Sequence, residues 1–132
     1  MKALDTNILV RFLVRDDTSM AARVDQLLDA ANTRGNSFFV SLPVVLELLW
    51  VLKSGYKRSR PDILDAVEKR SLMPVLTFDP ACPVHELVTE GRNSNLDLAD
   101  ILIGLGAKRQ GCETTLALDK KAARSELFEE IS

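Results

Sequence analysis

The feature that most constrains the fold is an alternation of short apolar stretches with longer amphipathic ones. Apolar stretches bounded by turn or capping residues predict strands, and apolar residues that recur every three or four positions predict helices. Because strands that alternate with helices form parallel sheets, we expect an α/β protein with a central parallel sheet flanked by helices in three layers. With 132 residues the chain has the length of one domain, which is predicted to span residues 1–132.

The predicted strands are residues 2–5, 38–40, 74–78 and 113–118. The predicted helices are residues 7–14, 20–31, 61–71 and 82–90, a segment capped by Ser41 that runs to about residue 53, and one from Asp97 to about residue 110. A helical turn is expected at residues 119–123, and residues 128–132 offer only a polar stub of a further strand. In such sheets ligands bind beyond the carboxyl ends of the strands, so the residues there are the functional candidates.

Charge and composition exclude several classes of protein. Seventeen Lys and Arg against nineteen Asp and Glu give a net charge of −2, so no overall basic field is available to bind polyanions without specificity. The longest apolar run, residues 42–52, is interrupted by Glu47 and is too short to span a bilayer. An acidic residue near the start, Asp5, argues against a signal peptide, so we expect a cytoplasmic protein without membrane contact. One histidine and two distant cysteines cannot form the usual zinc site.

Acidic residues gather at the predicted ligand edge. Asp5 ends the first strand, Asp119 follows the strand at 113–118, and Asp97 and Asp100 begin the helix just before that strand. Glu47 lies in a helix that is apolar nearly all round and is therefore predicted to be buried, where a carboxylate needs a partner. Several carboxylates without a cation repel one another, and Mg²⁺ or Mn²⁺ would relieve this repulsion.

Each acid also has a purely structural interpretation. Asp5, Asp97 and Asp119 could be helix caps, Asp100 could complement a helix dipole, and Glu47 could face solvent. The run Gly104-Leu105-Gly106 follows a helical stretch instead of a strand, so it predicts close helix packing and not a dinucleotide site.

Four motifs in this order resemble the PIN-domain nucleases. They are Leu4-Asp5-Thr6-Asn7-Ile8-Leu9, Val45-Leu46-Glu47-Leu48, Asp97-Leu98-Ala99-Asp100-Ile101-Leu102-Ile103 and Leu118-Asp119-Lys120-Lys121-Ala122. Any one of them alone is weak, but their order, spacing and the total length agree, so the resemblance covers essentially the whole chain. Within the family the chain is most similar to VapC, the toxin of type II toxin–antitoxin pairs.

The resemblance implies a magnesium- or manganese-dependent endoribonuclease held inactive by a VapB-like antitoxin. Carried over position by position, the catalytic and metal-binding acids are Asp5, Glu47, Asp100 and Asp119. Asp100 is preferred to Asp97 because the family's ligand directly precedes the apolar helix segment, although Asp97 lies one turn away on the same face. RNA is the implied substrate, and a homodimer is expected.

The chain departs from the family pattern at two places. The position two residues before the fourth acid is often Thr or Ser in the family and is Ala117 here, with Thr115 as a substitute hydroxyl. Many relatives also have a final strand, for which residues 128–132 offer only the polar stub.

An acidic site that cuts RNA needs cations around it. The candidates are Arg11, Arg15, Lys53, Lys57, Arg58 and Arg60, each of which could equally be a solvated surface charge. Trp50 is expected in the core or an interface, with a base-stacking platform as the alternative.

Two other functions stay open at this point. Asp5 could be the nucleophile of a phosphatase resembling the haloacid dehalogenases, but Asn7 stands where that motif has its second acid and the chain is short. A PIN fold kept as a non-catalytic interaction module would act through complex assembly or autoregulation, and the loss of an acid would be its signature.

Overall fold

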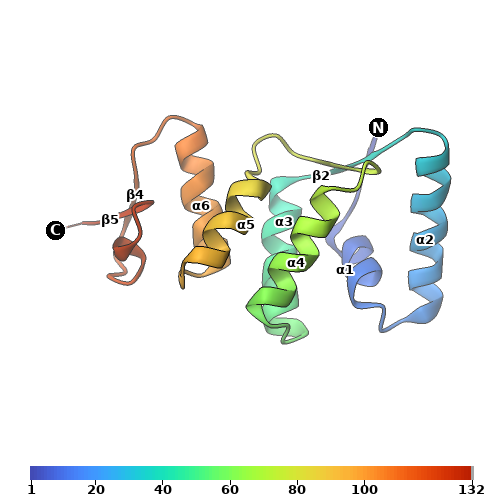
Figure 1. Ribbon diagram of the computed structural model, residues 1–132, viewed down its shortest axis with the longest axis horizontal. Coiled ribbons are helices and arrows are strands. Elements are labelled where there is room, and N and C mark those ends of the chain that lie inside the picture. Colours follow the sequence, from blue (N-terminus) through green and yellow to red (C-terminus); the bar gives the residue numbers. More distant parts are fainter. Residues whose placement is uncertain (132) are drawn as a thin grey trace. The chain divides into compact units, whose positions relative to one another are not determined.

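A computed structural model describes residues 1–131, which divide into two compact units. The first unit comprises Met1–Asp79, and the second begins at Pro80. Each unit contains helices and parallel strands, which confirms the predicted α/β class (Figure 1). That residues 1–132 form a single domain stays a prediction. None of the described helices is long and apolar enough to cross a membrane.

The first unit is built on a three-stranded parallel sheet in the order β1-β2-β3. The strands are β1 (Lys2–Ala3), β2 (Phe38–Val40) and β3 (Leu76–Phe78). Ala3 pairs with Phe39, and Phe39 pairs with Thr77, so the central strand is flanked on both sides. Because all three strands run the same way, their carboxyl ends lie at one edge of the sheet.

Helices connect these strands as the sequence predicts. They are α1 (Thr6–Val14), α2 (Thr18–Thr33), α3 (Leu42–Trp50), the wider π-helical segment η1 (Val51–Gly55) and α4 (Arg60–Ser71). Figure 1 shows α1 and α2, in blue, next to one another. The predicted cap is confirmed, because the Ser41 hydroxyl accepts a hydrogen bond of 3.4 Å from the Val44 amide.

The core of the first unit is aliphatic. Side chains from every helix and from β2 are buried there, each contributing roughly 1.5–3 kcal/mol by leaving water. Among them are Leu9, Val10, Val24, Leu28, Val40, Val45, Leu48, Leu49, Leu52, Ile63, Leu64 and Val67. The periodicity that predicted these helices is therefore the spacing of the residues that this core buries.

The second unit comprises two helices followed by a short parallel strand pair. The elements are α5 (Val84–Asn93), α6 (Leu98–Arg109), β4 (Thr115–Ala117), the 3₁₀ turn η2 (Ala122–Arg124) and β5 (Phe128–Glu130). β4 and β5 pair in parallel, with Thr115 opposite Phe128. Leu87, Ile101 and Leu102 are nearly inaccessible and form the centre of this unit.

The prediction for the C-terminal residues is wrong in part. Residues 128–130 form the strand β5 and not merely a polar stub, whereas Ser132 lies outside the described residues. Leu127 and Phe128 are buried at the start of this strand, so two apolar side chains anchor it despite Glu129 and Glu130. The helical turn expected at 119–123 begins three residues later, at Ala122.

Gly104 lets the C-terminal strand approach α6 closely. A Cβ at this position would lie 2.9 Å from the Cβ of Leu127 and 3.1 Å from Cε2 of Phe128. A Cβ on Gly106 would meet nothing within 4 Å. The predicted close packing is therefore confirmed for Gly104 and wrong for Gly106.

Alanine substitutions at these two glycines test that contact. Both changes gain about 1 kcal/mol of helix propensity, but only Gly104→Ala also forces a packing change, which costs about 1–3 kcal/mol. Urea unfolding should therefore find Gly104→Ala less stable than Gly106→Ala by about 1–3 kcal/mol. Equal stability of the two variants would contradict the close approach of β5 to α6.

Candidate active site

Asp5 lies at the carboxyl edge of the three-stranded sheet. The amide of Leu4 donates to the Phe39 carbonyl at 2.9 Å, so the chain leaves the sheet directly before Asp5. Asp5 is the N-cap of α1, and its Oδ1 accepts a 2.9 Å hydrogen bond from the Thr6 amide. Its side chain is exposed while Thr6 is buried. The predicted capping role is confirmed, and the other carboxylate oxygen makes no hydrogen bond with a described residue.

Glu47 is exposed, which contradicts the predicted burial. Helix α3 buries Val45, Leu48 and Leu49 on one side, and Glu47 lies on the other together with Trp50. Trp50 is 65% exposed, so it does not lie in the core, whereas its predicted place in an interface stays a prediction. Helix α3 has more apolar residues than its buried face contains. Because Glu47 is exposed, its carboxylate needs no partner to offset a cost of burial.

Asp97 and Asp100 both belong to the start of α6. Asp97 is the N-cap, and its Oδ1 accepts from the Ala99 amide at 2.9 Å, as expected. Asp100 lies in the first turn, half-buried, where the amino end of the helix favours a negative charge. The two acids therefore have separate structural tasks within one helical turn.

Asp119 is exposed on the segment between β4 and η2. Its Oδ1 accepts a 2.9 Å hydrogen bond from the Lys121 amide in the turn before η2. The N-cap of η2 is Lys121, without a side-chain hydrogen bond, so the predicted capping role of Asp119 is wrong. Thr115, two residues before Ala117, has a buried hydroxyl oxygen without a hydrogen-bond partner among the described residues. Whether this hydroxyl replaces the Thr or Ser of the family stays a prediction.

The four candidate acids are divided equally between the two units. Asp5 and Glu47 belong to the first unit, on helices α1 and α3 that pack together, and Asp100 and Asp119 belong to the second. No three His, Cys, Asp or Glu side chains within residues 1–131 form a group that could hold a metal ion. The chemistry of these side chains does fit a hard divalent cation, because all four would offer carboxylate oxygens as metal ligands. Asp5, Glu47 and Asp119 make no ion pair with any described residue.

Asp79 is a further acid at this edge that the sequence interpretation missed. It follows β3, its amide donates to the Val40 carbonyl at 2.8 Å, and its Oδ2 accepts from the Leu42 amide at 3.3 Å. Asp79 thus ties the end of β3 to the start of α3. The signal was available, because an Asp-Pro pair directly follows an apolar strand.

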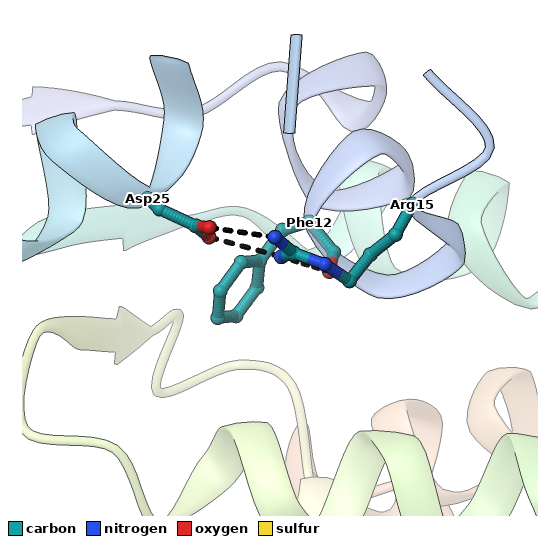
Figure 2. A network of polar contacts seen from close by, with 3 residues as sticks. All are labelled: Phe12, Arg15 and Asp25. Carbon is teal, nitrogen blue, oxygen red and sulfur yellow. Dashed lines mark hydrogen bonds and ion pairs between the residues drawn. The ribbon is translucent and has the colours of Figure 1, made fainter. Parts of the chain in front are cut away.

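Two of the predicted RNA-contacting arginines are paired with carboxylates. Arg11 lies 3.1 Å from Asp16, and Arg15 bonds Asp25 through both guanidinium nitrogens at 2.6 and 3.0 Å. Figure 2 shows Arg15 reaching from the end of α1 to Asp25 on α2, beside Phe12. The positive charge of both arginines is therefore compensated within the first unit.

A groove of about 480 Å³ lies between α1 and α2. Ile8, Met20, Val24 and Leu27 supply its apolar lining, and Met20 and Leu27 are more than 40% exposed. Asn7, Arg11 and Arg23 give it a polar rim. None of the candidate acids is among the residues that line this open groove.

The sequence is similar to a known family of proteins. The PIN domain matches residues 2–126. The chain belongs to the PIN domain family. All four candidate acids fall within the matched range. A curated relative, VapC ribonuclease from Aquifex aeolicus (strain VF5), is 35% identical over 121 residues, which are 92% of this chain and 89% of the relative. No solved structure matches the chain.

The Arg15–Asp25 pair should make stability depend on pH. Hydrogen bonds from Arg15 lower the pKa of Asp25 below the ordinary value of an aspartate. The stabilisation of the folded state by this pair is therefore complete above about pH 4. It is lost as the pH falls through the lowered pKa of Asp25 in the folded state. A double-mutant cycle of Arg15→Gln and Asp25→Asn should give favourable coupling at neutral pH and none in strong acid. Coupling that persists in acid would contradict this assignment.

Proposed function

We propose that this chain is an endoribonuclease of the VapC type that hydrolyses phosphodiester bonds in RNA. The observation that carries the proposal is the 35% identity to the Aquifex VapC ribonuclease across 92% of the chain. The PIN match over residues 2–126 and the presence of all four acids support it. A protein of this type acts in the cytoplasm.

Asp5, Glu47, Asp100 and Asp119 are the proposed catalytic acids, and they hold Mg²⁺ or Mn²⁺. When bound, such an ion would lower the pKa of the attacking water and stabilise negative charge on the phosphate oxygens. Asp5 and Asp100 are the principal ligands. Each is held at a helix start, Asp5 as the N-cap of α1 and Asp100 in the first turn of α6. Glu47 orients the attacking water, and its exposure on α3 leaves it accessible to substrate. Asp119 completes a second metal site or the outer shell of the first.

The proposed partner is a VapB-like antitoxin, and a homodimer is the proposed assembly. The groove between α1 and α2 supports the first part, because a protein segment with apolar side chains could cover Met20 and Leu27 there. Such burial would remove apolar surface from water without using any candidate acid.

Asp100→Asn and Asp97→Asn form a matched pair that tests the site. Purified, antitoxin-free protein should cleave a mixed RNA pool with Mg²⁺ or Mn²⁺ and not with chelator. Asp100→Asn should lower the cleavage rate on the order of 100-fold, equivalent to about 3 kcal/mol of transition-state stabilisation. Asp97→Asn keeps the oxygen that caps α6, so it should retain activity within a few-fold.

Three outcomes would contradict parts of the proposal. Chelator-resistant cleavage would contradict metal dependence. Cleavage that survives in Asp100→Asn but not in Asp97→Asn would exchange the two roles. No cleavage by folded protein would favour a PIN-fold interaction module without catalysis.

A further inference from the structure

Arg70 on α4 is a half-buried arginine that an aromatic ring holds in place and that has no carboxylate partner. Its guanidinium carbon lies 4.8 Å from the centre of the Phe12 ring. Its Nε is buried without a hydrogen-bond partner, and Arg70 makes no ion pair with any described residue. Burial lowers the pKa of Arg70, because apolar surroundings disfavour its positive charge. An unpaired cation in such surroundings is costly, so the position favours an anionic ligand.

A small groove of about 100 Å³ is lined by Arg70 and by a second arginine, Arg58. The end of α1, η1 and α4 supply its apolar wall, which consists of Leu13, Val14, Leu52, Ile63 and Ala66. Arg58 is exposed and, like Arg70, makes no ion pair with a described residue. Asp62 also lines the groove, but its carboxylate forms an ion pair with neither arginine. The lining therefore carries two positive charges and one negative charge.

Both arginines are held by contacts that leave their terminal nitrogens unused. The Phe12 ring lies against the Arg70 guanidinium, whose terminal nitrogens, unlike Nε, are not sealed from solvent. The Arg58 amide donates to the carbonyl of Leu52 at 2.9 Å, which fixes the backbone of Arg58 beside the wall of the groove. A planar guanidinium with free N–H groups matches the oxygens of a phosphate group, and a side chain that is already held loses less entropy on binding.

The size and the place of the groove restrict the ligand. Its volume of about 100 Å³ is well below the roughly 300–1,000 Å³ of a site for a drug-sized molecule, so it admits one small group. Val14 ends α1 and Asp5 caps its start, roughly 13 Å away at about 1.5 Å per residue, so the two positions cannot hold the same phosphate.

We propose that Arg58 and Arg70 bind one phosphate group in this groove, apart from Asp5. Inorganic phosphate and a phosphodiester of an RNA strand offer the same oxyanion, and the experiment below distinguishes these two sources. The inference goes beyond the proposed function, because binding of an anion here requires no cleavage.

The Nε–H signal of Arg70 in a ¹H–¹⁵N NMR spectrum reports on this groove, and Arg70→Lys identifies the signal by removing it. In chelator and at constant ionic strength, inorganic phosphate should shift this signal saturably, and chloride should not. Arg58→Gln should weaken phosphate binding about tenfold, because it removes one of two charged donors. Arg23→Gln removes the same charge from α2, outside the groove, and should leave the affinity unchanged. The backbone signals in the same spectra show whether each variant is folded.

Single-stranded RNA in chelator, where no cleavage is expected, identifies the source of the phosphate group. If RNA shifts the Arg70 signal and inorganic phosphate reverses this shift, the groove binds a phosphodiester of the strand. Anisotropy of labelled RNA should then find binding weaker in Arg58→Gln than in Arg23→Gln. A saturable shift with inorganic phosphate alone would support a site for the free ion.

Two results would overturn the proposal. One is an Arg70 signal that responds saturably to neither phosphate nor RNA. The other is a phosphate affinity that is the same in folded Arg58→Gln as in Arg23→Gln, which would place the anion elsewhere. Absence of phosphate binding with metal-dependent RNA cleavage intact would reject this inference alone. Saturable phosphate binding without cleavage would keep it and reject the proposed catalysis.

Discussion

The parallel pairing of β1, β2 and β3 is the constraint on which the first unit depends. It brings the carboxyl ends of three strands to one edge, where α1 and α3 begin. Free amides at these helix starts need acceptors, and Asp5, Ser41 and Asp79 supply them. The edge is therefore polar because the backbone requires it, before any catalytic demand is considered. A nuclease site can arise there by adding few groups to an edge that already holds carboxylates.

Capping and catalysis are compatible tasks for these acids. A carboxylate has two oxygens, and Asp5 and Asp119 each give one to a backbone amide. The hydrogen bond fixes the side chain, so less conformational entropy is lost when the other oxygen binds a ligand. The structural interpretation of each acid thus does not compete with the functional one. At α6 the two tasks fall to different residues. Asp97 caps the helix, and Asp100 is the proposed catalytic acid in its first turn.

Local patterns predicted the helices, the caps and the three strands of the first unit well, because these depend on neighbouring residues. Contacts between distant residues were not predictable in this way. The pairing of Arg15 with Asp25 and the strand β5 both depend on such contacts. For β5, the buried Leu127 and Phe128 outweigh the following glutamates, and their approach depends on a glycine 23 residues earlier, Gly104. The strand ends and helix starts pointed to Asp5, Asp97, Asp100 and Asp119, and the family's motifs then selected Asp100 over Asp97. Glu47 was found through a burial that the structure contradicts, and Asp79 was missed.

Helix α3 shows why composition alone misleads. Its sequence is apolar nearly all round, which predicts a buried helix, yet it packs only one face and exposes Glu47 and Trp50. Hydrophobic residues are often exposed because a folded protein does not have enough polar surface to cover itself. The composition of a helix therefore sets how much apolar surface it offers, whereas the elements packed against it decide how much of that surface is buried.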